Sequence, residues 1–307
     1  MNVEAIHVPV LLREVLDGLQ VKAGGRYVDC TLGSGGHARG ILEKSAPGGR
    51  LLGIDLDARA IEVARKQLAP YKQRITLVCD SFVRLKEIAS DHRFTPVDGV
   101  LFDLGVSSLQ LQQRQRGFSF QTEGPLDMRF DLNGEITASH LVNKLSEEKL
   151  ANILARYGEE PKAKAIARAV AKNRPLETTL ELASLVVRAV GQRRALHPAT
   201  KTFQALRIAA NEELKALSEV LPQTLAVVAS GGRIAIIAFH SLEDRLVKQF
   251  MARESQDCIC PPEVPVCACH HRRTLRVLTR KPIQPSSTDV EQNPRCRSAR
   301  LRVAVRL

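Results

Sequence analysis

The segment Tyr27-Val-Asp-Cys-Thr-Leu-Gly-Ser-Gly-Gly-His37 decides the fold, because an apolar strand runs into a glycine-rich turn that opens a helix. The pattern predicts a strand over Arg26–Thr31 and a helix from about Gly36 to Lys44. Glycines let the backbone approach a ligand closely, and the first turn of a helix offers free N–H groups. By itself the segment predicts either a nucleotide-like ligand at a strand end or only a tight turn.

Three more strand patterns follow within the first hundred residues, and helical patterns separate them. We expect these strands at Arg50–Asp55, Arg74–Cys79 and Val97–Asp103. Asp57 should cap the helix that follows the second strand, and another helix is expected at Pro9–Leu19. Repeated strand–helix units of this length predict an α/β fold, with a parallel sheet covered by helices on both faces.

The strand pattern stops after the fourth strand and returns only late in the chain. A polar loop is expected over 109–133, followed by helices at 147–156, 161–173, 179–190 and 200–220. Strands return at 232–239 and 298–306, and 258–285 resembles an irregular loop. We therefore expect a core at 1–108, an inserted all-helical substrate domain at 109–212 and the second part of the core at 213–307.

Acidic and aromatic residues follow the predicted strands, at the sheet edge where parallel α/β sheets bind their ligands. Asp55 can accept hydrogen bonds from both ribose hydroxyls of an adenosine, and Phe82 can contact the adenine. Asp103 ends the fourth strand. With the glycine turn, these residues predict a site for an adenosine that carries a methyl group, as in S-adenosylmethionine.

Asp103 is the catalytic candidate. A sulfonium donor is already reactive, so an enzyme mainly aligns the nucleophile, the methyl group and the sulfur. An exocyclic amine on a base is a poor nucleophile because its lone pair is delocalised into the ring. A carboxylate that accepts its N–H localises that pair and stabilises the developing positive charge. The alternative roles for Asp103 are a strand-end cap or an adenosine contact.

A second group of residues is predicted to bind the acceptor. In the loop 114–129, Arg116 and Arg129 are expected to pair with phosphates and Phe118 to stack on an extruded base, unless the loop simply packs on the core. Arg207 can face phosphate from the helix expected at 200–220. His240 follows a late strand, and is predicted to be either a proton acceptor or a structural histidine bonded to neighbouring acids.

The net charge of +12 favours a polyanionic partner, of which nucleic acid is the usual example. Residues 258–307 hold ten Lys and Arg against three Asp and Glu, so more than half of the excess lies there. No segment has the roughly 20 apolar residues of a membrane helix, and the first residues lack a signal-peptide layout, so we expect a cytoplasmic protein.

The seven cysteines are therefore expected to be reduced thiols or metal ligands rather than a disulfide framework. Cys258-x-Cys260 and Cys267-x-Cys269, followed by two histidines, could hold a metal ion. Their spacing is not the C-x2-C of common zinc sites, and exposed loop thiols are the alternative. On the sequence alone we assign no metal.

With these residues in view, nearly the whole chain resembles the bacterial ribosomal RNA cytosine-N4 methyltransferases that act on the small-subunit RNA. The resemblance rests on long strings in order: His7-x-Pro-Val-Leu-Leu-x-Glu14, Asp29-x-Thr-Leu-Gly-x-Gly-Gly-His37, Asp103-Leu-Gly-Val-Ser-Ser-x-Gln110, Arg116-Gly-Phe-Ser-Phe120, Gly124-Pro-Leu-Asp-Met-Arg129, Tyr157-Gly-Glu-Glu160, His197-Pro-Ala-Thr200, Phe203-Gln-Ala-Leu-Arg207, Phe239-His-Ser-Leu-Glu-Asp-Arg245 and Asn293-Pro-Arg-x-Arg-Ser-Ala299. Phe130, Ala238 and Leu109 depart from the usual pattern, which bears on substrate fit more than on the reaction.

The resemblance implies a class I methyltransferase (Rossmann-like) fold with an inserted helical substrate domain. It implies N4 methylation of a cytidine in the decoding region of 16S rRNA, within the small ribosomal subunit. It also implies S-adenosylmethionine as cofactor, held by Gly35, Gly36, His37, Asp55, Phe82, Asp103 and Gln110.

Two other classes of protein remain open. An NAD-linked oxidoreductase also has a glycine-rich turn and a later acid, although the third glycine of its fingerprint would fall at Ala38. An RNA-binding protein could keep a methyltransferase fold but lack this activity or use another acceptor. Whether the chain forms a homodimer, and at which stage of ribosome assembly it acts, are also left open.

Overall fold

The computed structural model describes residues 9–191, 197–261, 263 and 266–307. The start of the motif that begins at His7 lies outside the described residues. Among the described residues, the chain divides into two compact units: residues 9–105 with 215–307, and residues 106–214. Within the described part of the chain, no helix combines the length and apolarity needed to cross a membrane.

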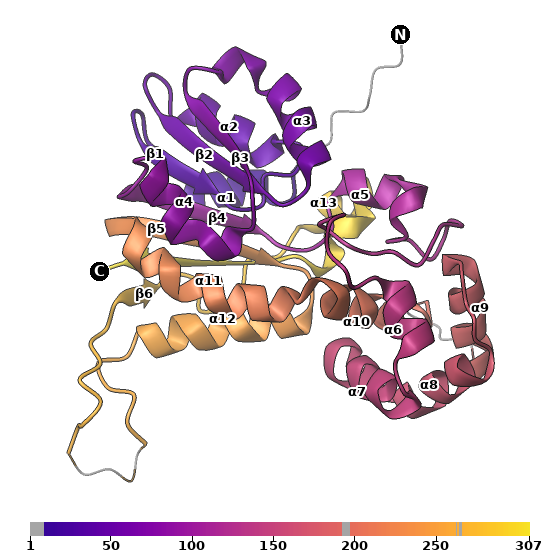
Figure 1. Cartoon of the computed structure of the whole chain (residues 1–307). Coiled ribbons are helices and arrows are strands. Elements are labelled where there is room, and N and C mark those ends of the chain that lie inside the picture. Colours follow the sequence, from indigo (N-terminus) through magenta and orange to yellow (C-terminus); the bar gives the residue numbers. More distant parts are fainter. Residues whose placement is uncertain (1–8, 192–196, 262, 264–265) are drawn as a thin grey trace. The chain divides into compact units, whose positions relative to one another are not determined.

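The first unit is built on a seven-stranded sheet in the order β3-β2-β1-β4-β5-β7-β6 (Figure 1). Strands β1 to β5 are parallel, and β7 runs antiparallel to both of its neighbours. The fold is thus the α/β sheet that the sequence predicts. Its strands are β1 (Arg26–Asp29), β2 (Arg50–Asp55), β3 (Ile75–Cys79), β4 (Val97–Asp103), β5 (Val228–Ala238), β6 (Leu275–Val277) and β7 (Arg300–Arg306).

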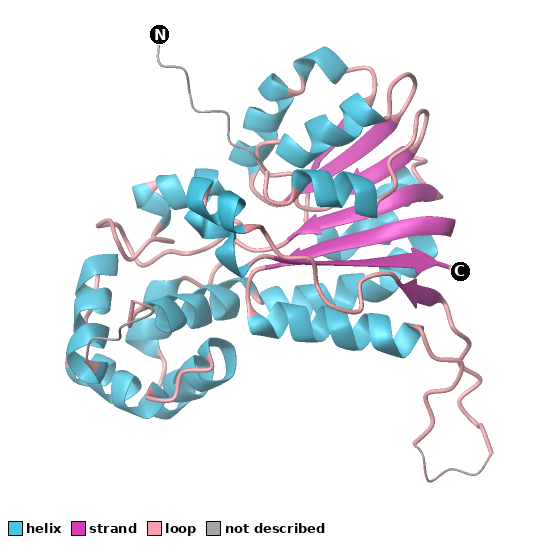
Figure 2. Ribbon diagram, turned by 180° about the vertical axis from the view of Figure 1, so that it is seen from behind, coloured by secondary structure: helices cyan, strands magenta, loops and turns pink. Residues whose placement is uncertain are grey.

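Helices cover both faces of this sheet (Figure 2). One face packs on α1, α2 and α3, and the other on α4, α11 and α12, because successive strand residues such as Leu51 and Leu52 point to opposite sides. The helices of this unit are α1 (Leu12–Gly18), α2 (Gly36–Lys44), α3 (Ala58–Gln67), α4 (Leu85–Asp91), α11 (Glu213–Val227), α12 (Ser241–Glu254) and α13 (Ser287–Gln292). As predicted, the Asp57 carboxylate caps α3 by accepting from the backbone N–H of Arg59.

The second unit is helical, and its described residues contribute no strand to the sheet. Apolar side chains from α6 to α10 and from the preceding loop share one core. Asn211, at the end of α10, connects the loop before α6 to the helices. Its side chain accepts a hydrogen bond from Phe130 N (2.7 Å) and donates one to Met128 O (2.7 Å). The helices are α5 (Ser108–Gln112), α6 (Ala138–Lys144), α7 (Glu147–Gly158), α8 (Ala163–Lys172), α9 (Thr179–Val190) and α10 (Thr200–Asn211).

Three sequence predictions need correction. The helix expected at 200–220 is two helices, α10 and α11, because Glu212 adopts a left-handed conformation (φ 49°) that ends the first. The loop expected at 109–133 contains α5, since Ser107 caps it and exchanges hydrogen bonds with Gln110. The stretch 258–285 is not wholly irregular, because β6 lies within it and pairs with β7.

Candidate functional site

The candidate site lies at the carboxyl ends of β1, β2 and β4. The chain crosses from β1 to β2 on one side and later returns to β4 on the other, so β1 and β4 form the point where the strand order reverses. Ligands of open α/β sheets bind outside such a point. Asp29, Asp55 and Asp103 are the last residues of these three strands, which brings three carboxylates to one edge.

Asp29 and Asp103 are linked through the residues that follow β1. The hydroxyl of Thr31 accepts a hydrogen bond from the backbone N–H of Asp103 (2.6 Å), while Thr31 N donates to Asp29 Oδ1 (3.2 Å). His37, in the first turn of α2, places Nε2 3.5 Å from Oδ2 of Asp103. The His37 side chain is buried and that of Asp103 is 27% exposed, so Asp103 is the accessible member of the group.

Several buried polar atoms of this group have no hydrogen-bond partner among the residues that the structure describes. They are Oδ2 of Asp29, both ring nitrogens of His37 and Oδ1 of Asp103. Buried polar atoms are nearly always paired, and an unpaired one costs about 1–3 kcal/mol. Four such atoms in one place mark a site at which a ligand or ordered water supplies the missing partners.

Burial changes the acidity of two of the carboxyl groups. It raises the pKa of Asp29 to about 7, although the nearby His37 and the N–H of Thr31 act in the opposite direction. Burial also raises the pKa of Asp55 to about 6, against the hydrogen bonds donated by Asp57 and Gly33. A cation at this edge of the sheet would favour the ionised form of both carboxyl groups.

Asp55 also holds the glycine-rich turn in place. Its Oδ2 accepts from Gly33 N (2.7 Å) and its Oδ1 from Asp57 N (2.9 Å). A carboxylate has about four acceptor positions, so capacity remains for the ribose hydroxyls that the sequence assigned to this residue.

The three glycines of the turn have different tasks. Gly35 has φ 90°, and a Cβ there would approach Leu68 to 2.8 Å; a Cβ on Gly36 would approach Pro9 to 2.6 Å. These two glycines therefore permit close packing of the turn against its neighbours. At Gly33 (φ 53°) a Cβ would meet no described atom closer than Thr31 O, at 4.0 Å, so it is the glycine of the turn that leaves room beside the strand ends.

The remaining predicted donor contacts are Phe82, in the first unit, and Gln110, in the second. The ring of Phe82 meets Phe102 edge-on, with centroids 5.8 Å apart, and is only partly buried, so part of it stays accessible to an adenine. Gln110 belongs to the second unit, where its Oε1 accepts from Ser107 N (3.1 Å).

Sequence reasoning did not select Asp29 and Gly33 as site residues. The signal was present, because Asp29 is the only acid in β1 and precedes the turn directly. What the sequence could not show was that Asp29 would be almost completely buried, with 1% of its surface exposed and one oxygen unpaired.

Two predicted acceptor residues occupy the interior of the second unit and correct the expectation that they face RNA. Arg116 is 1% exposed, and its guanidinium donates to the carbonyls of Arg129 (2.8 Å) and Phe130 (3.0 Å). Phe118 is buried and stacks on Phe130, with centroids 5.5 Å apart. Both side chains therefore pack inside the unit and stabilise the loop 114–129, and packing was the alternative to RNA binding that the sequence left open for this segment.

The other predicted acceptor residues are engaged in ion pairs or caps. Arg129 pairs with Asp127 (2.8 Å) and Arg207 with Glu213 (2.8 Å), and both arginine side chains are mostly buried. His240 is the N-cap of α12, where its Nδ1 accepts from Glu243 N (3.3 Å). The structure thus shows the histidine bonded to a neighbouring acid that was one of the two roles considered for His240, and its role as a proton acceptor stays a prediction.

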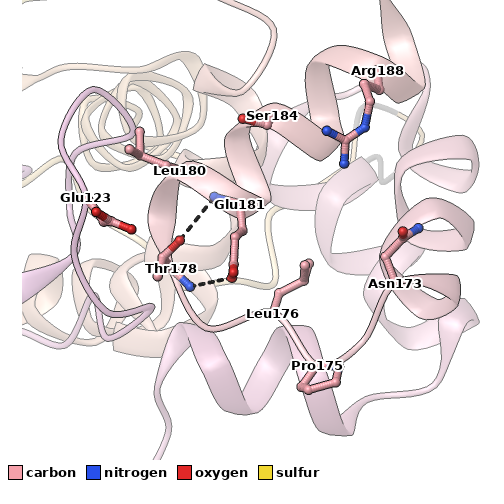
Figure 3. A pocket seen from close by; sticks show the side chains of 9 residues that line it. All are labelled: Glu123, Asn173, Pro175, Leu176, Thr178, Leu180, Glu181, Ser184 and Arg188. Carbon is pink, nitrogen blue, oxygen red and sulfur yellow. Dashed lines mark hydrogen bonds between the residues drawn. The ribbon is translucent and has the colours of Figure 1, made fainter.

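A pocket of about 460 Å³ lies elsewhere, in the second unit beside the start of α9. Figure 3 shows Thr178 and Glu181 in its wall, where each accepts a hydrogen bond from the backbone of the other. Of the two acids in its wall, Glu123 and Glu181, the second is thus occupied in capping the helix. None of the predicted site residues lines this pocket.

The sheet order, the antiparallel β7 and the acidic strand-end site define a class I methyltransferase. Comparison with known proteins is consistent with this class, since the profile of the MraW methylase family matches residues 4–307. The chain belongs to the MraW methylase family.

Relatives with assigned names support this placement. The chain is similar to the ribosomal RNA small subunit methyltransferase H of Thermomicrobium roseum, at 52% identity over 305 residues, covering 98% of this chain and 94% of the relative. It is 50% identical over 306 residues to the protein of that name from Dehalococcoides mccartyi strain ATCC BAA-2100, covering 99% and 88%.

Solved structures show weaker similarity. A putative rRNA methylase from Clostridium thermocellum is 14% identical, with a TM-score of 0.46 and coverage of 98% of this chain and 100% of that one. SMU.1697c, a putative methyltransferase from Streptococcus mutans in complex with SAH, is 11% identical, with a TM-score of 0.46 and coverage of 98% and 100%.

Proposed function

We propose that this chain transfers a methyl group from S-adenosylmethionine to N4 of a cytidine in the decoding region of 16S rRNA, with the small ribosomal subunit as its partner in the cytoplasm. The observation that carries the proposal is the cluster of unpaired buried polar atoms on Asp29, His37 and Asp103. Membership of the MraW methylase family and the names of its relatives support a small-subunit ribosomal RNA as the acceptor, and the resemblance of the sequence motifs implies N4 of a cytidine in its decoding region.

The charge of the site fits a cationic donor better than a dinucleotide. S-adenosylmethionine carries its methyl group on a positively charged sulfur, and its amino-acid end adds one ammonium and one carboxylate group, so the donor is a net cation. Asp29, Asp55 and Asp103 offer three acidic groups at the sheet edge. An NAD pyrophosphate would bring two negative charges to the same edge, which these carboxylates would repel. The site therefore favours the methyltransferase over the oxidoreductase.

The residues around the turn divide the binding of the donor. Asp55 would accept from the ribose hydroxyls, Phe82 would contact the adenine, and Gly33 would leave room for the donor to approach. The N-cap of α2 is Gly35, and no described side chain caps this nine-residue helix, so its first N–H groups would bind the donor carboxylate. Asp29 would neutralise the positive end of the donor.

Asp103 would act on the acceptor. In the transfer the bond between methyl carbon and sulfur breaks and leaves S-adenosylhomocysteine, a bond from that carbon to N4 forms, and N4 loses one proton, which would pass to Asp103 and from there to solvent. A carboxylate that accepts an N–H of the amine keeps the N4 lone pair localised and stabilises the positive charge that develops there. Asp103 is the partly exposed carboxylate of the cluster, as this role requires.

The second unit and the basic C-terminal segment would bind the RNA. Residues 106–214 form a separate compact body whose interior is fixed by its own core. The excess of Lys and Arg after position 258 supplies phosphate affinity. Gln110, at the start of the helical unit, remains a proposed donor contact.

Transfer of labelled methyl groups to purified 30S subunits tests the proposal. We expect one labelled N4-methylcytidine in 16S rRNA, found by nuclease digestion and mass spectrometry, and saturable binding of S-adenosylmethionine with no binding of NAD. Labelling of another base, or binding of NAD alone, would reject the proposed reaction. Donor binding without any transfer to RNA would identify the non-catalytic RNA-binding alternative.

A further inference from the structure

The four cysteines of the loop between α12 and β6 lie together, although the sequence analysis assigned no metal to them. Their sulfur atoms all lie within 4.8 Å of one another. Sγ of Cys269 is 3.6 Å from that of Cys267 and 3.8 Å from that of Cys258. Residues of the first arm of the loop, which holds Cys258 and Cys260, therefore meet residues of the second arm, which holds Cys267 and Cys269. We propose that Cys258, Cys260, Cys267 and Cys269 bind one structural zinc ion.

The distances between the sulfurs fit a tetrahedral site. Zinc–sulfur bonds of about 2.3 Å in tetrahedral geometry place neighbouring sulfurs about 3.8 Å apart. A disulfide would need a separation of about 2.05 Å. An iron–sulfur cluster distributes its four cysteines over two or four iron atoms and would spread the four sulfurs further apart. A single small ion with a preference for four thiolates is therefore the best occupant, and zinc is the divalent ion with that preference.

Backbone groups around the cluster point at the sulfurs. Cys258 Sγ accepts from Cys260 N (3.4 Å), Cys260 Sγ from Ala268 N (3.4 Å) and Cys269 Sγ from Ile259 N (3.5 Å). N–H donors stabilise negative charge on sulfur, which is the form that binds a metal. Two of these bonds connect one arm of the loop to the other, so the backbone holds the sulfurs of both arms together.

The base of the loop is also closed by hydrogen bonds. Thr274 N donates to Glu254 O (2.8 Å), the Thr274 hydroxyl donates to Glu254 Oε2 (2.7 Å), and His271 Nε2 lies 3.2 Å from Arg253 O. Figure 1 shows the loop extending from this base, in orange, between α12 and β6. The cysteines themselves are exposed or half-exposed, so no apolar core holds them, and a metal ion would supply the missing cross-link.

Four protein ligands leave no open coordination position, so the ion would be structural and take no part in methyl transfer. The zinc site would exist whether or not the chain methylates RNA. Zinc binding would fix the shape of the loop, whose second arm leads directly into Arg272 and Arg273. The two C-x-C pairs come one from each arm of the loop, as the two cysteine pairs of common zinc sites come from two separate segments.

Metal analysis of the untagged full-length chain, expressed with zinc and purified under reducing conditions, tests the proposal. We expect about one zinc ion per chain. Cys258→Ser and Cys267→Ser, one in each arm, should lose it, whereas Cys79→Ser, an exposed thiol at the end of β3, should retain it. Zinc content equal to that of a variant with serine at all four positions would overturn the proposal.

A second measurement keeps the test valid if a serine variant folds poorly. In the unmodified chain, the four thiols should resist alkylation until a chelator is added, as read by peptide mass spectrometry, while Cys79 reacts throughout. Replacement by Co²⁺ should give the visible absorption of a tetrahedral cobalt thiolate. Equal alkylation of all five cysteines before and after chelation, or disulfides among the four in the freshly isolated chain, would contradict a zinc site.

Discussion

Nε2 of His37 lies 3.5 Å from Oδ2 of Asp103, which joins the first turn of α2 to the end of β4 across the point where the strand order reverses. The histidine is buried and the carboxylate is partly exposed. The Asp103 carboxylate therefore lies against His37 on one side and is open to a substrate on another, whereas His37 can be reached only by a ligand that enters the buried part of the cluster. This arrangement makes Asp103 the most direct target for substitution.

Asp103→Asn should lower the rate of methyl transfer by about 100-fold, because it removes the charge that stabilises the developing cation on N4 but preserves the size of the side chain. Binding of S-adenosylhomocysteine should change much less. Single-turnover transfer to 30S subunits and calorimetric binding separate the two effects. Asp91→Asn, at an exposed carboxylate of α4, is the matched control. Unchanged transfer by Asp103→Asn would remove Asp103 from the reaction.

Asp29→Asn should stabilise the ligand-free protein at alkaline pH. Burial raises the pKa of Asp29 to about 7, so the folded chain keeps its proton between about pH 4 and pH 7 while the unfolded chain loses it. The free energy of unfolding contributed by this group therefore falls as the pH rises through that window. Asparagine does not titrate, and the variant should be more stable by up to roughly 4 kcal/mol near pH 8.

Urea denaturation of both proteins over this pH range measures the effect. The difference in unfolding free energy between variant and unmodified chain should grow with pH and level off above the folded pKa. A difference that is independent of pH would show that Asp29 does not carry the raised pKa. The same variant should bind S-adenosylmethionine more weakly, because it has lost the acid proposed to face the positive end of the donor.

Gly35→Ala and Gly33→Ala should separate packing from binding. Gly35 has a left-handed backbone, and the new methyl group would collide with Leu68. The free energy of unfolding should therefore fall by roughly 2–3 kcal/mol. At Gly33 the methyl group has space, and only the strain of about 1 kcal/mol remains. Donor binding should nevertheless weaken in folded Gly33→Ala. Thermal unfolding measures the stability of each variant, and titration with the donor measures its binding. An equal loss of stability in both variants would contradict separate roles for Gly35 in packing and Gly33 in binding.

Arg116→Met should destabilise the second unit and leave the electrostatics of RNA binding unchanged. The substitution removes two charge-assisted hydrogen bonds to backbone carbonyls inside the loop, at a cost of about 3 kcal/mol. If Arg116 instead contacted a phosphate, the slope of log affinity against log salt would decrease by about 0.7–0.9. Denaturation and a salt titration of RNA binding distinguish these outcomes, and a reduced slope would restore Arg116 to the RNA-binding surface.

The α/β unit could be predicted well because its elements carry local signals. Helix α2 and strands β2 and β4 begin and end where the sequence pattern places them, since a polar or glycine residue bounds each apolar run. The break at Glu212 could not be predicted, because it depends on a left-handed backbone at a residue type that usually continues a helix. Strand β6 was missed because three residues are too few to show alternation.

The site was predictable as a set of strand ends but not as a set of contacts. Position along a parallel sheet brings Asp55 and Asp103 to one edge whatever surrounds them. Burial is a property of the folded molecule, and it decided the cases that sequence reasoning misjudged. Arg116 and Phe118 are of residue types that are typical of RNA-binding loops, yet both side chains lie in the interior of the second unit. The cysteine pairs also needed the fold, because only the return of the chain into β6 brings the two arms together.

The position of β7 sets the order in which this protein can assemble during synthesis. Residues Arg300–Arg306 pair with β5 on one side and with β6 on the other. Until they leave the ribosome, β5 is an open sheet edge that other chains can pair with. The helical unit, a continuous segment from 106 to 214, is complete about ninety residues earlier. The nascent chain therefore carries a finished helical body beside an unfinished sheet, and that interval is when chaperones have most to protect.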